Sequence, residues 1–223
     1  MTKKLLISAI TKFFAGVVLV GLLLFLPAGT IRWPGGWLLM AILFVPMFGA
    51  GLVMMAKNPS LLEHRLDAKE KEAEQGLIIK LSGLMFLAGF IVAGLDFRFG
   101  WFPLPAWVRW IAAVLFLAAY LLYAEVLREN TWLSRTIEVQ EGQQVVDTGL
   151  YGIVRHPMYA VTLLLFLSMP LVLGSLIALA VFLCYPFLIA ARIRNEENVL
   201  EKDLAGYAAY QKKVRWRLIP YLW

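Results

Sequence analysis

The chain has 223 residues, of which 61% are hydrophobic and 16% charged, with a mean hydropathy of +0.74. No soluble domain of this length could bury so much apolar surface, so the composition predicts an integral membrane protein. The net charge of +6 does not require nucleic acid, since basic residues also set membrane orientation. The single Cys184 excludes an internal disulfide and a cysteine metal cluster.

Four apolar stretches in the first part of the chain are long enough to cross a membrane as helices. Charged residues of mixed sign fill the gap between the second and third stretches, and we interpret them as an interfacial segment at 57–76. A short aromatic loop is expected at 96–105. Residues 1–127 are therefore expected to form a four-span membrane region, with spans at 13–31, 35–56, about 77–95 and 107–127.

Residues 158–191 contain no charged side chain. As one straight helix this run of 34 residues would be about 51 Å long, well beyond a hydrocarbon core of roughly 30 Å. Met169-Pro170 and Gly174-Ser175 are helix breakers near its middle. The run therefore predicts a C-terminal helical hairpin, which gives about six transmembrane helices and returns residue 192 to the side of residue 157.

The basic residues divide unequally between the two sides of this topology. Of the 21 Lys and Arg residues, only Arg32, Arg98 and Arg109 fall opposite the side that holds both termini. The positive-inside rule then predicts cytoplasmic N- and C-termini, in the cell (inner) membrane if the protein is bacterial.

The two ends of the hairpin carry the residues that could bind a ligand or take part in a reaction. Pro157 is favourable at the first position of a helix, whose N–H groups together with Arg155 and His156 could bind an anion. Arg192 and Glu196 are four residues apart and share one helix face. An anion site beside a carboxylate suits a zwitterion such as the amino-acid end of S-adenosyl-L-methionine. The alternative is that these side chains only anchor helices at the headgroup level and form a solvated salt-bridge network.

Aromatic residues near both hairpin ends have two interpretations. They could stack on an adenine ring or face a sulfonium, or they could form the aromatic belt of the membrane interface. The residues concerned are Tyr151, Tyr159, Tyr207, Tyr210 and Trp216.

Two motifs carry a family resemblance. Residues 149–159 read Gly-x-Tyr-x-x-x-Arg-His-Pro-x-Tyr, and residues 192–200 read Arg-x-x-x-Glu-Glu-x-x-Leu. Together with the hairpin between them, they resemble the isoprenylcysteine carboxyl methyltransferase family, over roughly residues 130–220. The resemblance implies an all-α membrane fold with S-adenosyl-L-methionine as cofactor, and the charge division places its catalytic loops in the cytoplasm. It makes residues 128–223, with the membrane hairpin at 158–191, the methyltransferase region.

The resemblance also implies roles for individual residues. Arg192 matches the arginine beside the substrate, and Arg192 and Glu196 are the expected catalytic residues. No metal site is expected. The expected cofactor contacts are Gln143, Gln144, Val145, Val146, Tyr151, Arg155, His156, Pro157, Met158, Tyr159, Glu196 and Glu197.

These observations predict an S-adenosylmethionine-dependent methyltransferase that acts on a lipophilic or membrane-associated acceptor by carboxyl O-methylation. Phospholipid N-methylation and small-thiol S-methylation remain alternatives. So do an NADPH-dependent membrane reductase, with Arg215 and Arg217 at the 2′-phosphate, and a non-catalytic membrane binding protein. The expected partners are the lipophilic acceptor and membrane lipid, with no nucleic acid and no obligate protein partner.

Overall fold

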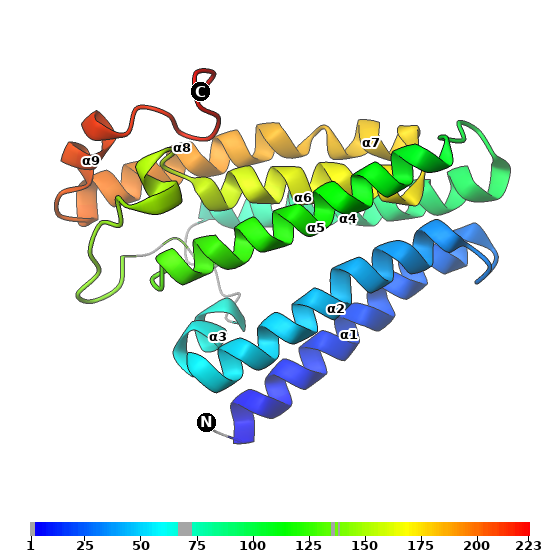
Figure 1. Ribbon diagram of the computed structural model, residues 1–223, viewed down its shortest axis with the longest axis horizontal. Coiled ribbons are helices and arrows are strands. Elements are labelled where there is room, and N and C mark those ends of the chain that lie inside the picture. The colour runs from blue at the N-terminus through cyan, green and yellow to red at the C-terminus, as the bar shows by residue number, and fades with distance from the viewer. Residues whose placement is uncertain (1–2, 67–72, 135–136, 138) are drawn as a thin grey trace.

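The computed structural model describes residues 3–66, 73–134, 137 and 139–223, and it contains helices but no strand over these residues (Figure 1). The expected all-α membrane architecture is confirmed. Five segments are long and apolar enough to cross a membrane. They are α1 (Lys3–Ala28), α2 (Pro34–Lys57), α4 (Ala73–Phe99), α5 (Ala106–Glu129), and the combined α7 (Leu176–Phe182) and α8 (Tyr185–Asp203).

A sixth crossing depends on α6 (Pro157–Leu173), which has 17 residues. At 1.5 Å per residue α6 is about 25 Å long, a little shorter than a typical hydrocarbon core. The count of six spans therefore stays a prediction. The expected reversal of the chain within 158–191 is present, because α6 runs antiparallel to α7 and α8 (Figure 1).

The reversal occurs at Gly174-Ser175, while Pro170 stays inside α6. Gly174 ends α6 in the left-handed conformation (φ 81°), which glycine adopts without a steric penalty. The Ser175 hydroxyl accepts a hydrogen bond from the Ala178 N–H (3.1 Å) and so caps α7. The same hydroxyl donates to the buried Asp96 carboxylate at 2.5 Å. The end of α4 is thereby tied to the tip of the hairpin.

The aromatic loop expected at 96–105 begins later than predicted. Helix α4 continues to Phe99, and Gly100 ends it with φ 64° and a hydrogen bond from its N–H to the Asp96 carbonyl (2.7 Å). Of the interfacial segment expected at 57–76, α3 (Pro59–Leu66) forms the first part. Residues 67–72 lie outside the described residues.

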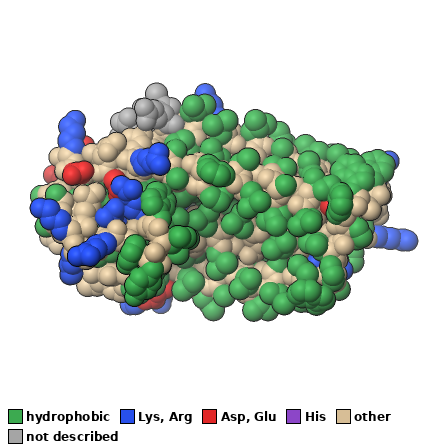
Figure 2. Space-filling view, turned by 90° about the horizontal axis from the view of Figure 1, so that it is seen from above, with side chains coloured by type: hydrophobic (Ala, Val, Ile, Leu, Met, Phe, Trp, Pro, Cys, Tyr) green, Lys and Arg blue, Asp and Glu red, His purple; other side chains and the backbone are tan. Residues whose placement is uncertain are grey.

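The helices pack as a bundle with one polar end. Helix α6 packs against α5, α2 and α8, and α1 packs against α4 and α2 (Figure 1). Helix α3, the short 3₁₀ helix η1 (Gly149–Gly152) and α9 (Tyr207–Lys213) gather at the end where the hairpin opens. Charged side chains cluster at this end, whereas hydrophobic side chains cover most of the remaining visible surface (Figure 2). Such an apolar surface is that of an integral membrane protein.

Candidate functional site

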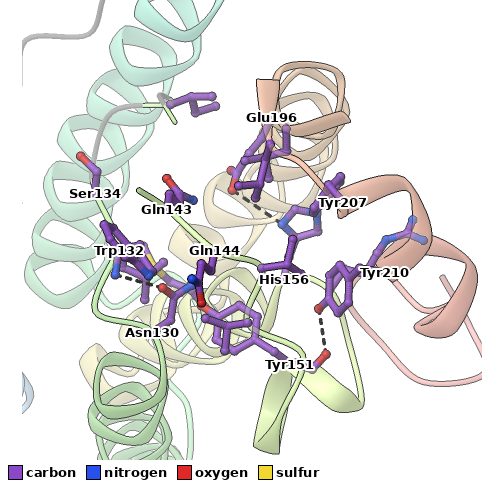
Figure 3. A pocket seen from close by; sticks show the side chains of 18 of the residues that line it. Asn130, Trp132, Ser134, Gln143, Gln144, Tyr151, His156, Glu196, Tyr207 and Tyr210 are labelled. Carbon is purple, nitrogen blue, oxygen red and sulfur yellow. Dashed lines mark hydrogen bonds and ion pairs between the residues drawn. The ribbon is translucent and has the colours of Figure 1, made fainter. Parts of the chain in front are cut away.

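A pocket opens at the polar end of the bundle, between residues 130–159 on one side and α8 and α9 on the other (Figure 3). It contains about 840 Å³ not occupied by protein atoms, part of it open to solvent. Because the two walls come from opposite ends of the hairpin, the pocket exists only when the hairpin is closed.

Most residues predicted as site residues line this one pocket. Pro157 and Glu197 are the two that do not. The predicted residues among its lining are Gln143, Gln144, Val145, Val146, Tyr151, Arg155, His156, Met158, Tyr159, Arg192 and Glu196.

The backbone before the pocket is shaped by a glycine in the left-handed region, a conformation that other residues rarely adopt. Gly149 has φ 51°, and a Cβ atom at this position would lie 1.4 Å from the Glu129 carboxylate. That carboxylate accepts a hydrogen bond from the Leu150 N–H at 2.9 Å. The first glycine of the motif therefore lets the end of α5 hold η1, and with it Tyr151, against the pocket.

Glu196 presents its carboxylate to the pocket. The Tyr159 hydroxyl donates a hydrogen bond to it, and His156 Nδ1 lies 3.8 Å from its Oε1 atom (Figure 3). The Glu196 side chain is 22% exposed, whereas that of His156 is 5% exposed. The carboxylate is thus held in place and still accessible to a ligand.

Glu197 has different surroundings. Its side chain is 4% exposed, and its carboxylate accepts hydrogen bonds from Arg155 Nε and Arg217 Nε, each at 2.7 Å. It also lies 3.2 Å from His156 Nε2. His156 is therefore fixed between the two glutamates, with Glu197 on the side away from the pocket.

Arg155 was expected to donate to a bound anion, but its guanidinium is engaged within the protein. Besides Glu197, it donates to the backbone carbonyls of Gln211 (3.4 Å) and Val214 (3.2 Å). The N–H groups of Arg155 and His156 donate to the carbonyls of Trp216 and Arg217, both at 2.9 Å. Arg155 thus joins the motif to the C-terminal segment.

Arg192 lies beside Glu196, and its guanidinium donates to the side chains of Tyr159 and Gln75. Its Nε donates to the Tyr159 hydroxyl at 2.9 Å, and its Nη1 donates to Gln75 Oε1 at 3.0 Å. A continuous chain of hydrogen bonds therefore runs from Gln75 at the start of α4, through Arg192 and Tyr159, to Glu196. Gln75 had been assigned only to the interfacial segment.

Residues 110–202 match the sequence model of the isoprenylcysteine carboxyl methyltransferase (ICMT) family. These residues belong to that family. The matched region includes α6, α7, most of α5 and nearly all of α8, and it contains both glutamates, His156 and Arg192.

Two further proteins are similar to this chain. The Delta(14)-sterol reductase of Mus musculus is 34% identical over 91 residues, which are 40% of this chain and 22% of the reductase. The uncharacterized protein YpbQ of Bacillus subtilis is 27% identical over 167 residues, which are 74% of this chain and 96% of YpbQ. The chain therefore spans only about a fifth of the reductase.

The pocket of the ICMT-family region has further lining residues that were not predicted as site residues. The sequence indicated Tyr207, Tyr210 and Trp216 only as possible stacking partners of a ligand. Trp216 does not line the pocket, and its ring packs against Tyr221. For the remaining lining residues, the sequence feature that could have indicated a site was Trp132, which lies among polar residues directly after the apolar span 107–127. The additional lining residues are Asn130, Trp132, Leu133, Ser134, Ile137, Leu200, Leu204, Tyr207 and Tyr210.

The lining chemistry of the ICMT-family pocket fits S-adenosylmethionine. The amides of Asn130 and Gln144 suit the polar edge of a nucleobase, and Glu196 suits a positively charged group. The buried Tyr207 hydroxyl has no hydrogen-bond partner among the described residues. Burial, followed by the charges of the two glutamates, raises the pKa of Tyr207 well above its usual range, so the hydroxyl stays a donor at neutral pH.

A surface ion pair connects two parts of this pocket. Lys213 Nζ in α9 lies 2.6 Å from Asp147 Oδ2. Asp147 directly follows the lining residues 143–146 in the sequence. The hydrogen bond from Lys213 lowers the pKa of the exposed Asp147 carboxyl. Both side chains are well exposed, so the pair orients the loop more than it stabilises the fold.

Proposed function

We propose that this membrane protein transfers a methyl group from S-adenosyl-L-methionine to a lipophilic acceptor that carries a carboxylate. The observation that carries the proposal is the position of Glu196. Its accessible carboxylate lies in the pocket of an ICMT-family region, held by Tyr159 and beside both His156 and Arg192. A ligand with a positive centre and an acceptor with a negative one can meet there.

The cofactor would be held by residues from both walls. When bound, S-adenosylmethionine supplies an electrophilic methyl group on a positively charged sulfur. Glu196 compensates positive charge, and the faces of Tyr151 and Trp132 offer stacking surfaces. Tyr207 offers a hydroxyl whose hydrogen-bonding capacity no described residue uses.

The acceptor would be oriented by Arg192. A guanidinium can hold a carboxylate through two parallel hydrogen bonds, which fixes the direction of its oxygen atoms. A carboxylate oxygen is already anionic and accepts a methyl group without losing a proton, so no general base is needed. An amine or a thiol would need one, and Glu196 or His156 would be the candidate base.

A membrane reductase is the second candidate, because the mouse relative is a Delta(14)-sterol reductase by name. Of the two arginines predicted for a 2′-phosphate site, Arg217 donates to the buried Glu197 carboxylate at 2.7 Å and lies over the Trp223 ring. Arg217 is thus engaged in the protein, which favours the methyltransferase. Arg215 is exposed.

Calorimetric titration of the detergent-purified protein would test the proposal. We expect S-adenosylmethionine and S-adenosylhomocysteine to bind and NADPH not to bind. Binding of NADPH without either sulfur nucleoside would overturn the proposal in favour of the reductase. Incubation with lipid extract and a methyl-labelled donor, followed by base hydrolysis, would identify an ester product, since esters release the label and methylated amines or thioethers keep it.

We further propose that the pocket faces the cytoplasm, where S-adenosylmethionine is made. The division of the basic residues supports this orientation, because only Arg32, Arg98 and Arg109 are assigned to the opposite side.

A further inference from the structure

Gln75 is a buried polar residue outside the ICMT-family region. It is the third residue of α4, and its exposed fraction is 0%. A glutamine is rarely buried to this extent unless its amide is satisfied. Only half of this amide is satisfied among the described residues.

The orientation of the Gln75 amide follows from its partner. Oε1 accepts the hydrogen bond from Arg192 Nη1 at 3.0 Å, and the flipped amide would instead direct N–H groups at a guanidinium, which only donates. The Nε2 atom therefore points elsewhere, and it has no hydrogen-bond partner among the described residues. A buried donor without a partner calls for an acceptor that the described residues do not provide.

The location of this amide links it to the acceptor side of the pocket. Arg192 lines the pocket, and Gln75 lies behind it, with Oε1 at 3.0 Å from Arg192 Nη1. Because Oε1 and Nε2 belong to one planar group, an oxygen that reaches Nε2 would lie close to the Arg192 guanidinium.

A second guanidinium contacts the start of α6. Arg65 of α3 donates to the Tyr123 hydroxyl and lies 3.8 Å from the sulfur of Met158, which lines the pocket. Arg65 and Arg192 thus contact adjacent residues of α6, Met158 and Tyr159. Cations at both positions favour a ligand with negative charge.

We infer that Gln75 is a specificity-determining residue of the acceptor site, whose amide N–H donates to an anionic oxygen of the methyl acceptor beside Arg192. This inference rests on the proposed function. It gives α4, which precedes the ICMT-family region, a part in choosing the acceptor.

The test is a direct binding measurement in detergent, without methyl transfer. The probes are N-acetyl-S-farnesyl-cysteine, a lipophilic carboxylate, and its uncharged carboxamide. Gln75→Leu removes both hydrogen-bonding atoms of the amide. Gln75→Glu keeps an oxygen on Arg192 but replaces the donor with a second acceptor. Gln211→Leu in α9 is the matched control.

We expect wild type and Gln211→Leu to bind the carboxylate at least tenfold more tightly than the carboxamide. Both Gln75 variants should lose at least tenfold in carboxylate affinity and keep S-adenosylmethionine affinity within twofold. A Gln75→Glu variant that keeps its carboxylate affinity would show that the residue only positions Arg192, and would overturn the inference. The inference would also be overturned if the wild type did not prefer the carboxylate to the carboxamide, or if both Gln75 variants lost S-adenosylmethionine binding in parallel.

The two proposals can fail separately. If the carboxylate preference depends on Gln75 but the wild type does not bind S-adenosylmethionine, the anion site stands and the methyltransferase proposal is wrong. If S-adenosylmethionine binds and Gln75 has no effect on carboxylate affinity, the methyltransferase proposal stands and the inference about Gln75 is wrong.

Discussion

Glu196 and Glu197 are neighbours on α8, yet their carboxylates have different surroundings. Glu197 is buried against Arg155, His156 and Arg217, whereas Glu196 reaches the pocket with 22% of its side chain exposed. Consecutive residues of a helix point about 100° apart, and this angle separates a ligand-facing carboxylate from a structural one.

The two glutamates should therefore respond differently to loss of charge. Glu196→Gln should weaken S-adenosylmethionine binding by roughly ten- to a hundredfold, since a charge-assisted contact contributes about 1–3 kcal/mol, while stability changes little. Glu197→Gln should lower the free energy of unfolding by roughly 3–5 kcal/mol, because it leaves the buried Arg155 guanidinium uncompensated. Titration calorimetry and denaturant unfolding in mixed micelles measure the two quantities. Glu201→Gln, on an exposed face of α8, is the control, and similar effects of Glu196→Gln and Glu197→Gln would contradict the assignment.

Arg192→Lys should reduce methylation of a carboxylate acceptor by about ten- to a hundredfold and change cofactor affinity little. Lysine keeps the charge but lacks the planar guanidinium, which donates to both Tyr159 and Gln75 and which we propose to orient the acceptor carboxylate. Initial rates with a labelled methyl donor would measure the effect, with the exposed Arg194→Lys as control. Collapse of cofactor binding would place Arg192 in the cofactor site. Unchanged turnover would favour an amine or thiol acceptor.

Reporter fusions within residues 57–72 and after residue 213 should both give a cytoplasmic signal. The positive-inside rule and the return of the hairpin place these positions on one side. A fusion in the loop after Phe99 is the control and should report the opposite side. A C-terminal fusion on the far side would remove the physical basis for the shared pocket.

Ser175→Ala should destabilise the fold by about 1–2 kcal/mol without affecting cofactor affinity. The variant loses the cap of α7 and the hydrogen bond to the buried Asp96 carboxylate. Thermal unfolding in detergent would measure the change. Ser168→Ala should cost less, because among the described residues the Ser168 hydroxyl bonds the Leu164 carbonyl of its own helix and no second group. Equal effects of the two variants would mean that the tie to Asp96 contributes nothing.

Part of this structure follows from local patterns in the sequence. The uncharged run 158–191 predicted the reversal, and the reversal alone brings His156 and Glu196 together. The position of the turn was less certain, because Pro170 and Gly174 both break helices in water. Pro170 remains inside α6, where the surrounding helices shield the backbone, and Gly174 is the residue with a positive φ.

The contacts that patterns could not predict are long-range ones. Gln75 and Arg192 are 117 positions apart, and no periodicity of either helix indicates that they meet. The roles of Arg155 and Glu197 were also unpredictable from composition, since a charged pair at a membrane surface can face either ligand or protein. The hydrogen bonds that Arg155 and Arg217 donate to Glu197 decide between these roles.

The closed hairpin has a consequence for how the protein is made. One wall of the pocket, up to Tyr159, leaves the ribosome before the hairpin, and the other wall, from Arg192 onward, leaves after it. A nascent chain that ends within the hairpin therefore carries half of a binding site and cannot retain a ligand. Binding competence arises late in synthesis, when α8 is inserted against α6 and the second wall reaches the first.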